Sequence, residues 1–491
     1  MAHMLNTVGQ QPGADSFIDK AFFEHYRCPD SFAHVMVTGS PSTESGYFRF
    51  GPHAIGYGQC SAGFTAPRAT DDLYDVLQDV LSAGSVLQLP FHPSEVVANL
   101  RHERYLSGPN RHPQARAVWS ALRQAYYLAR PLLPKTARIT LQRAYLKDWH
   151  EIRFPRWPVD STVEQIFEMQ LALSLKAQSA NRMPFIWFWP DGAHSCAIVT
   201  HDVETSRGRD YCDRLMDADD GFGIKSAFQI VPEGRYTVPR DLLHRIRSRG
   251  FEIGVHDLNH DGRLFSHDQL FKRRAERINR YASEYGAIGF RAAVLYRNME
   301  WLRQLDFAYD MSAPNVGHLE AQRGGCCTVM PFFVGDTLEL PTTTTQDYSL
   351  FHILKQYSID LWKQQLAAIS EKHGLANFIV HPDYLLERRA LETYKQLLGH
   401  LAKLRSLGKT WLALPREVNQ WWRERSRMTL TRRGDTWAIE GAGKERGRVA
   451  HASVEGSRVV YRVQPAFGGV YFCLHALYDV AVSAMAVVRP I

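Results

Sequence analysis

The chain has little cysteine for its length. Its 491 residues include 7 cysteines, an odd and sparse set, and the adjacent Cys326 and Cys327 have no second cysteine pair at zinc-site spacing. This usage argues against a disulfide framework and against a structural zinc cluster built from cysteines. It favours a protein that folds in the reducing cytoplasm.

Long apolar runs and recognisable leader features are also missing. No run of about 18 apolar residues occurs, so we expect no transmembrane helix. The first residues lack the charged and apolar regions of a secretory signal, and a second methionine at position 4 indicates a cloning tag. We therefore expect a disordered tail over residues 1–20 and a cytoplasmic location.

The composition that remains is that of an ordinary globular protein. Hydrophobic residues make up 45% and charged residues 22% of the chain, which is long enough for two or three domains. We find no internal repeat. The glycine-bearing loop at 51–58 lacks the Gly-Lys-Ser/Thr ending of a phosphate loop, so no nucleotide site is predicted there.

Positive charge is concentrated in one segment. Between Arg101 and Arg156 there are twelve Lys and Arg against three Asp and Glu, a net charge of +9, whereas the whole chain has +7. Leucines and aromatics are interleaved with these charges, as in a basic amphipathic helix on an anionic membrane surface or beside an anionic ligand. A solvated helix face packed on the next domain is an equal alternative. No nucleic-acid-binding motif accompanies the charge, so we expect no nucleic acid partner.

From residue 195 onward, strand and helix patterns alternate, which indicates a parallel α/β architecture. Strands are predicted at 195–201, 226–231, 251–256, 288–293, 307–310, 338–341, 376–381 and 410–413. Helices are predicted at 239–248, 266–284, 298–304, 357–373, 385–406 and 415–425. We expect an α+β region with basic helices at 21–190. Short runs at 437–439, 458–463 and 470–474 predict a small all-β domain at 427–491.

Chemically reactive side chains follow several of these strands. Asp202 and Glu204 come directly after the first strand, and His256 and His260 end the third. A carboxylate and two histidines can bind one divalent ion and leave a position for water, as catalytic zinc sites do. With 21 histidines, a pair four residues apart also arises by chance. The order of the residues at strand ends, with Arg291 and His381 after two later strands, favours the site.

These motifs resemble the polysaccharide deacetylase family, also called the NodB homology domain or carbohydrate esterase family 4. The match covers roughly residues 190–415 and is similar to the branch whose first motif is Thr-His-Asp-Val-Asp. The resemblance implies a distorted (β/α) barrel of about seven strands at 191–426, with a Zn²⁺ or similar ion. It also implies a role for each motif residue: Asp202 as general base, Glu204, His256 and His260 as metal ligands, Arg291 as holder of the base, His381 as general acid, and Asp310 as its orienting partner.

The chain departs from the family pattern at several positions. Glu204 stands where the branch has aspartate, and Val203 where the commonest motif has a second aspartate. Alanines follow Arg291 in place of proline and glycine. Asp257 and Asp261 flank the histidines and are predicted to support them from outside the metal shell.

The resemblance implies removal of an N-acetyl group from a sugar of a bacterial surface polysaccharide or its precursor. Two alternatives stay open: a catalytically silent glycan-binding or scaffold protein, and a hydrolase of a non-sugar C–N bond. The +9 segment favours a diphosphate-linked precursor as partner. It also allows peripheral contact with the anionic inner face of the membrane.

Overall fold

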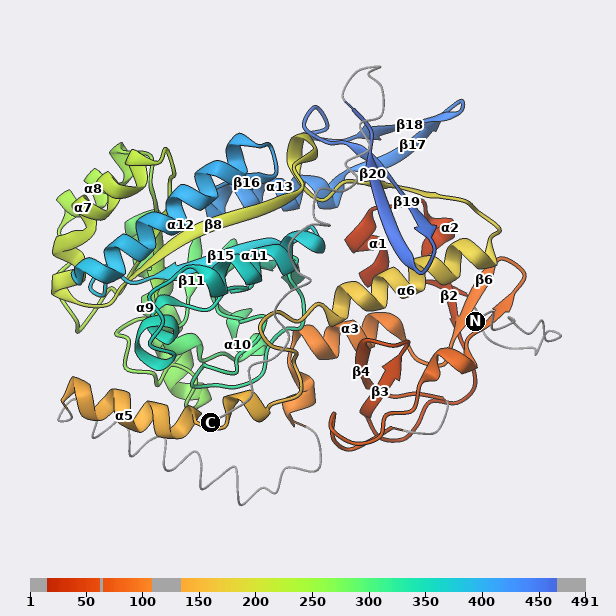
Figure 1. Cartoon of the computed structure of the whole chain (residues 1–491), viewed down its shortest axis with the longest axis horizontal. Helices are drawn as coiled ribbons and strands as arrows, with labels where there is room; N and C mark the ends of the chain where they lie inside the picture. Colours follow the sequence, from red (N-terminus) through yellow and green to blue (C-terminus); the bar gives the residue numbers. More distant parts are fainter. Residues whose placement is uncertain (1–15, 62–64, 108–133, 466–491) are drawn as a thin grey trace, which may run out of the picture.

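A curled sheet of nine strands lies in the left half of the molecule as viewed in Figure 1. The computed structural model describes residues 16–61, 65–107 and 134–465. All pairings in the sheet are parallel except β13 with β14. The main order is β13 (Phe332–Val334), β14 (Thr337–Glu339), β12 (Tyr309–Asp310), β11 (Gly289–Arg291), β10 (Glu252–His256), β9 (Ala227–Ile230), β8 (Ser195–Val203) and β15 (Leu375–Val380), and β16 (Thr410–Leu412) also pairs with β8.

Helices alternate with these strands, as the sequence predicts. They are α7 (Ser206–Gly221), α8 (Arg240–Ser248), α9 (Asp268–Tyr285), α10 (Met299–Leu302), α11 (Asp360–Glu371), α12 (Arg388–Ser406) and α13 (Pro415–Arg427). All eight predicted strands of this region are present. The sequence prediction missed α7, a helix rich in Asp and Arg that buries only a narrow stripe including Cys212, Leu215 and Met216. It also missed the short antiparallel strand β13.

The sheet is distorted around β8. Cys196 and Ala197 of β8 pair with β15 and also with β16, so β16 occupies the edge of β8 that β9 occupies further along. β9 pairs only with the last part of β8, from Thr200 to Val203. The strands β9 and β16 therefore diverge from a common neighbour, and the sheet curls as half of a barrel.

A seam lies between β15 and the segment 342–347, which follows β14. Threonine side chains bridge it. The hydroxyl of Thr343 donates to the carbonyl of Leu375 at 2.6 Å, and that of Thr344 donates to the carbonyl of Asn377 at 2.8 Å. The backbone N–H of Asn377 donates to Thr343 Oγ1 at 2.9 Å. The segment 342–347 thus runs beside β15 without forming a ladder with it.

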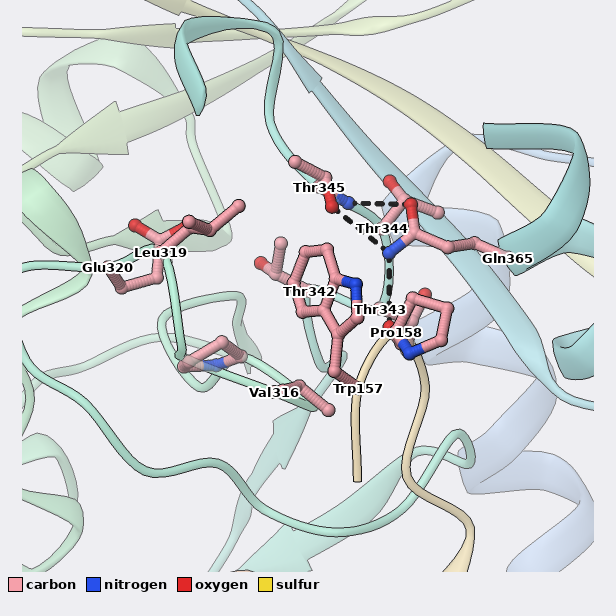
Figure 2. Close-up of a pocket in the computed structure, with 11 residues that line it drawn as sticks. Trp157, Pro158, Val316, Leu319, Glu320, Thr342, Thr343, Thr344, Thr345 and Gln365 are labelled. Carbon is pink, nitrogen blue, oxygen red and sulfur yellow. Dashed lines mark hydrogen bonds between the residues drawn. The ribbon is translucent and has the colours of Figure 1, made fainter. Parts of the chain in front are cut away.

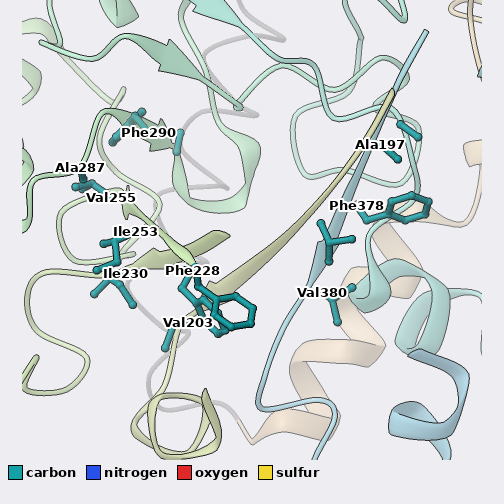
Figure 3. Close-up of a cluster of buried hydrophobic side chains, with 14 of the residues drawn as sticks. Ala197, Val203, Phe228, Ile230, Ile253, Val255, Ala287, Phe290, Phe378 and Val380 are labelled. Atoms are coloured by element: carbon teal, nitrogen blue, oxygen red, sulfur yellow. The ribbon is translucent and has the colours of Figure 1, made fainter. Parts of the chain in front are cut away.

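The strands of the sheet are buried on both faces. All nine residues of β8 and all six of β15 are buried, which is why these strands appear in the sequence as apolar runs. Figure 3 shows part of the core, to which Val203, Phe228 and Val380 contribute from three neighbouring strands. Burial of such side chains contributes about 1.5–3 kcal/mol each. The helices on the outside fix the strands, and hence the strand ends, in register.

The N-terminal region has a four-stranded sheet of its own, ordered β1 (Phe17–Ile18), β2 (His34–Val37), β6 (Val86–Leu89) and β5 (Leu81–Ala83), and a hairpin of β3 (Gly46–Phe50) and β4 (Ala54–Gly58). Its helices are α1 (Lys20–Tyr26), α2 (Asp30–Ala33), α3 (Pro93–Arg101), α5 (Lys135–Leu146) and α6 (Thr162–Ala177). Single turns are η1 (Val76–Asp79), η2 (Arg104–Ser107), η4 (Trp149–Glu151), η5 (Pro190–Gly192), η6 (Ala293–Leu295) and the π-helical η7 (Ser349–Ile353).

The predicted tail over 1–20 is too long, because β1 begins at Phe17.

Only part of the C-terminal region forms a separate sheet. β17 (Thr429–Arg433) pairs with β18 (Thr436–Glu440), but β19 (Val449–Glu455) pairs with both β20 (Arg458–Val463) and β7 (Met183–Ile186). Since β7 precedes the barrel, the predicted boundaries at 190 and 427 cut through one three-stranded sheet.

The predicted run 470–474 lies outside the described residues. Within the described part of the chain, no helix has the length and apolar character that a membrane span needs.

Candidate active site

Asp202 and Arg291 form a buried ion pair at the carboxyl ends of two strands. Side chains alternate along β8, so Thr200 and Asp202 share one face. Nη1 of Arg291 donates to Asp202 Oδ1 at 2.6 Å and to Thr200 Oγ1 at 2.7 Å. Burial by itself raises the pKa of Asp202, but the charges of Arg291, His256 and His381 outweigh burial and lower it below the ordinary value. Asp202 is therefore held as an oriented carboxylate.

Glu204, His256 and His260 converge on one point. Their candidate ligand atoms all lie within 4.8 Å of one another. Oε1 of Glu204 lies 2.8 Å from Nε2 of His260 and 3.8 Å from Nε2 of His256. The extra methylene of Glu204, compared with aspartate, carries its carboxylate into this cluster. Burial raises the pKa of Glu204, yet His260 and the other nearby histidines lower it well below its usual range.

The histidine nitrogens of this cluster fit a divalent ion. Nδ1 of His256 faces the carbonyl oxygen of Arg291 at 3.1 Å, which makes Nδ1 the donor and leaves the lone pair of Nε2 for a ligand. Nε2 of His256 and Nδ1 of His260 are buried without a hydrogen bond, whereas Nε2 of His260 contacts only the carboxylate of Glu204 at 2.8 Å. An unpaired buried polar group costs about 1–3 kcal/mol, which a bound ion would recover. Two imidazoles and one carboxylate are a donor set of catalytic zinc sites.

The loop between the two histidines has a strained backbone. Asp257 and His260 both have positive φ, 55° and 54°. A side chain in this region is uncommon, and such residues concentrate at functional sites. The backbone N–H of Asp257 donates to the carbonyl of Arg291 at 2.9 Å, and Asp257 Oδ1 accepts from the N–H of Leu258 at 2.6 Å. These bonds hold a turn that carries His260 back towards Glu204.

Of the two aspartates predicted to support the histidines, Asp257 interacts with them electrostatically, and Asp261 pairs with Arg274. Asp261 accepts two hydrogen bonds from Arg274, at 2.7 and 2.6 Å, and Asp257 caps its own turn. The group that orients His256 is instead the backbone carbonyl of Arg291. A backbone partner leaves no trace in a residue pattern, which is why the sequence prediction missed it.

His381 directly follows β15 and also approaches Glu204. Nε2 of His381 lies 3.3 Å from Glu204 Oε1. Its Nδ1 is 2.6 Å from Asp347 Oδ1, and its backbone N–H donates to Asp347 Oδ2 at 2.8 Å. Burial lowers the pKa of His381, but the carboxylates of Asp347 and Glu204 raise it well above the ordinary value. Asp347 therefore fixes the ring and favours its protonated form.

The prediction that Asp310 orients His381 is wrong. Asp310 accepts hydrogen bonds from the hydroxyl and the N–H of Ser312, at 2.7 and 3.1 Å, and faces Glu339 on the neighbouring strand. Burial and the adjacent Asp310 raise the pKa of Glu339 well above its usual range. Asp347 was missed because it begins a helical turn after a run of four threonines, with no strand end to mark it.

Aromatic rings and α5 border the His381 side of the site. The ring of Tyr384 lies 4.8 Å from that of His381 and 4.9 Å from that of His352, between centroids. α5 packs on η7 at this border (Figure 1). Nε and Nη2 of Arg143 both donate to the carbonyl of His352, at 2.8 and 2.5 Å, and the Tyr348 hydroxyl donates to Gln142. Part of the basic segment thus lies beside the candidate active site.

No family model matches the chain, and no curated protein matches it in sequence. Several solved structures are similar to it, most of them polysaccharide deacetylases. One from Mycobacterium smegmatis has 18% identity and a TM-score of 0.41, and the match covers 50% of this chain and 97% of that one. Another from Bordetella bronchiseptica, described as involved in O-antigen biosynthesis, has 17% identity and a TM-score of 0.31, with 48% and 86% covered. PuuE allantoinase has 11% identity and a TM-score of 0.38, with 48% and 92% covered.

Proposed function

We propose that the protein is a metal-dependent hydrolase that removes an N-acetyl group from a sugar. The observation that carries this proposal is the convergence of Glu204, His256 and His260 between two buried pairs, Asp202 with Arg291 and His381 with Asp347. Held by those three ligands, a divalent ion such as Zn²⁺ would polarise the amide carbonyl and lower the pKa of bound water to about 7.

The protein's own groups supply the proton transfers. Asp202 accepts the proton of the attacking water, and Arg291 keeps it ionised and oriented. His381 donates a proton to the amide nitrogen as the C–N bond breaks, because an amine leaves poorly as an anion. Water and the N-acetyl group thereby give acetate and a free amine. Asp347 holds Nδ1 of His381, so that Nε2 is the atom presented to the substrate.

Metal analysis and acetate release test this proposal together. We expect about one divalent ion per chain in protein purified without chelators, and loss of that ion in the His256→Ala/His260→Ala double variant. Asp202→Asn should retain the ion and lose acetate release from N-acetylated sugars by about 10²-fold or more. A wild-type protein that binds no divalent ion, even when Zn²⁺ is supplied, would contradict the proposal.

The two alternative functions predict different results for the same variants. A silent glycan-binding protein would bind sugars equally well as the wild type and as Asp202→Asn, with no acetate released by either. The unpaired Nε2 of His256 and the convergence of Glu204 and His260 on the same point favour an active site over this alternative. A hydrolase of a non-sugar amide would release acid or ammonia from small amides and leave sugars unchanged.

We also propose an anionic, diphosphate-linked precursor of a bacterial surface polysaccharide as the substrate, met in the cytoplasm or at the inner membrane face. Support comes from α5, whose Arg143 lies beside η7, and from the exposed Lys147, Arg153 and Arg156 that follow it. Arg111, Arg116, Arg123 and Arg130 of the same basic segment lie outside the described residues. Flotation with anionic and neutral liposomes tests the membrane contact, which should weaken as salt is added. Binding to neither would contradict it.

A further inference from the structure

His201 has no part in the proposed reaction, although it stands between Thr200 and Asp202 on β8. Side chains alternate along a strand, so Thr200 and Asp202 share the face of the candidate site and His201 lies on the other face. There its ring meets α7, and its side chain has an exposed fraction of 0%. A fully buried imidazole needs hydrogen-bond partners inside the protein.

Both ring nitrogens of His201 lie beside oxygen atoms that act as acceptors. Nδ1 is 3.1 Å from the carbonyl oxygen of Val380, and Nε2 is 3.1 Å from Oδ2 of Asp219. A carbonyl oxygen cannot donate, so Nδ1 carries a hydrogen. Asp219 already accepts from the hydroxyls of Ser226 at 2.6 Å and Tyr394 at 2.5 Å. Nε2 therefore donates to this carboxylate as well, and the ring holds a proton on each nitrogen.

Two aromatic rings enclose the imidazole of His201. The ring centroid of Phe228 lies 4.9 Å away, and that of Tyr394 lies 5.8 Å away with its plane at 82°. Burial and the charge of Asp219 raise the pKa of Tyr394 well above its ordinary value, so the Tyr394 hydroxyl stays a donor. Packing from the sides and hydrogen bonds at both nitrogens give the imidazole a single orientation.

The bond from His201 reaches β15 at the residue before the proposed acid. β8 and β15 pair in parallel up to His201 and Val380, where the ladder ends. Thr200 donates from its hydroxyl to the carbonyl of Phe378 at 2.7 Å. Side chains of β8 thus hold two carbonyls of β15, and His201 holds the one that directly precedes His381.

The opposite edge of β15 is held in a similar way. Hydroxyls of the segment 342–347 donate to the carbonyls of Leu375 and Asn377 across the seam. Figure 2 shows part of this segment, which hydrogen bonds also tie to Gln365. Side-chain donors therefore fix β15 from both edges, and among them His201 acts nearest to the carboxyl end of the strand.

We infer that His201 is a positioning residue that sets the place of the general acid His381 relative to the general base Asp202. The inference rests on the proposed function, which gives these two residues their roles. His201 adjoins Asp202 in the chain, and its ring holds the carbonyl before His381. One rigid side chain therefore joins the two strand ends that carry the base and the acid, and it acts through the backbone of both.

Two amide variants of His201 separate its two bonds. Nδ2 of asparagine takes the place of ring Nδ1 beside Val380, whereas Nε2 of glutamine takes the place of ring Nε2 beside Asp219. We expect His201→Gln to lower kcat for acetate release from N,N′-diacetylchitobiose by about tenfold or more, because small displacements of reacting groups are costly. His201→Asn should keep kcat within a few-fold. KM should change little in both, since the ring lies on the face of β8 away from the candidate site.

His373→Asn is the matched control. Its Nδ1 also faces a backbone carbonyl, that of His194 at 3.2 Å, but His373 lies just before the other end of β15. This variant should keep the wild-type kcat. Urea unfolding of all three variants shows how much stability each one loses. Equal losses of kcat in His201→Gln and His201→Asn would contradict the inference.

Magnetic resonance of the histidine rings separates failure of this inference from failure of the proposed function. In wild-type protein labelled with ¹⁵N-histidine, both nitrogens of His201 should be protonated at about pH 7. An unprotonated Nδ1 cannot donate to Val380 and would overturn the inference, even if a variant fails to fold. The ring signals of His381 should move in His201→Gln and stay in place in His201→Asn and His373→Asn.

The two readouts together give distinct outcomes. The expected His381 signals without acetate release by the wild type would keep the coupling of His201 to His381 and overturn the deacetylase. Acetate release at the wild-type kcat by both His201 variants, with the His381 signals unmoved, would overturn the positioning role and keep the deacetylase.

Discussion

Among single residues, Asp347 is the most important member of the candidate site that the motif pattern does not include. It holds His381 through both carboxylate oxygens, one on the ring and one on the backbone N–H. A carboxylate in this position favours one tautomer and stabilises the charged ring, as in other acid–base sites. Asp310 has no such contact, because its oxygens are committed to Ser312.

The first prediction compares these two aspartates. Asp347→Asn should lower kcat by about 10²-fold, because the amide stabilises the charged ring poorly and offers one acceptor in place of two. KM should change little, since the substrate does not touch Asp347. Asp310→Asn is the matched control and should keep kcat within a few-fold. Initial rates of acetate release measure both. Equal losses in the two variants would contradict the assignment.

The second prediction concerns Glu164, buried on α6. Burial raises its pKa to about 7, against an ordinary value of 4.5, even though Thr328 and Val329 donate to Oε1. The folded protein binds this proton more tightly than the unfolded chain does, so protonation of Glu164 adds to the free energy of unfolding. The contribution is complete below pH 4.5 and is lost as the pH rises through 7. Glu164→Gln keeps Oε1 and cannot ionise.

Relative to wild type, Glu164→Gln should therefore gain about 3 kcal/mol of unfolding free energy between pH 4 and pH 8, since each pKa unit corresponds to about 1.4 kcal/mol. Urea unfolding at the two pH values gives this difference. Glu44→Gln, at an exposed carboxyl, controls for the loss of charge. A difference between Glu164→Gln and wild type that does not change with pH would show that the carboxyl is ionised in the fold.

Among the helices that border the candidate site, α5 has few buried apolar side chains. Leu141 and Tyr145 on it remain about half exposed, and its contacts with the barrel side are mainly polar. Arg143 donates twice to the His352 carbonyl, and the Tyr145 hydroxyl donates to the Ala321 carbonyl at 3.2 Å. An element held by few buried apolar contacts opens more easily than the core.

The third prediction follows from these contacts. Arg143→Ala removes both hydrogen bonds to His352, and such charge-assisted bonds are worth about 2 kcal/mol. We expect amide exchange within 135–146 to accelerate by about tenfold or more, while exchange in β8 and β15 stays unchanged. Lys147→Ala, at an exposed position just beyond α5, is the control. Unaltered exchange in α5 would show that other contacts hold the helix.

In the whole molecule, the C-terminal strands share a core with the rest of the chain. Ala450 and Ala452 of β19 are buried against β7, in the same cluster as Phe167 of α6 and Ile198 of β8. Arg425, buried near the end of α13, donates to the carbonyls of Ile186 and His25 at 2.7 and 2.8 Å. The region after residue 427 therefore stabilises the barrel and the N-terminal region together.

The fourth prediction tests this sharing. Ala452→Asp buries an unpaired charge between β7 and β20 and should cost about 3 kcal/mol or more. Val454→Asp, two residues along and exposed, should cost little. Thermal unfolding followed by a probe in the barrel, such as retention of the metal ion, should shift to lower temperature only in Ala452→Asp. A shift seen only in β19 and β20, with the barrel unchanged, would indicate an independent C-terminal domain.

The sequence by itself determined the barrel strands and much of the candidate site. Strands buried on both faces must be apolar throughout, so β8 and β15 are visible as runs. Residues directly after such runs share one end of a parallel sheet, so a linear pattern predicts that Asp202, His256 and His381 meet. The prediction extends to Glu204, His260 and Arg291 because each lies within a few residues of a strand end, where local geometry fixes its direction.

Only the tertiary structure decided the features that depend on contacts between distant segments. Asp347 begins a helical turn and is placed by the threonine seam that precedes it rather than by a strand of its own. β19 pairs with β7 across more than 260 residues, a choice that no local pattern encodes. His201 meets Val380 and Asp219 only because β15 and α7 pack on β8. Periodicity specifies which face of an element is buried, but packing of the whole chain selects the partner.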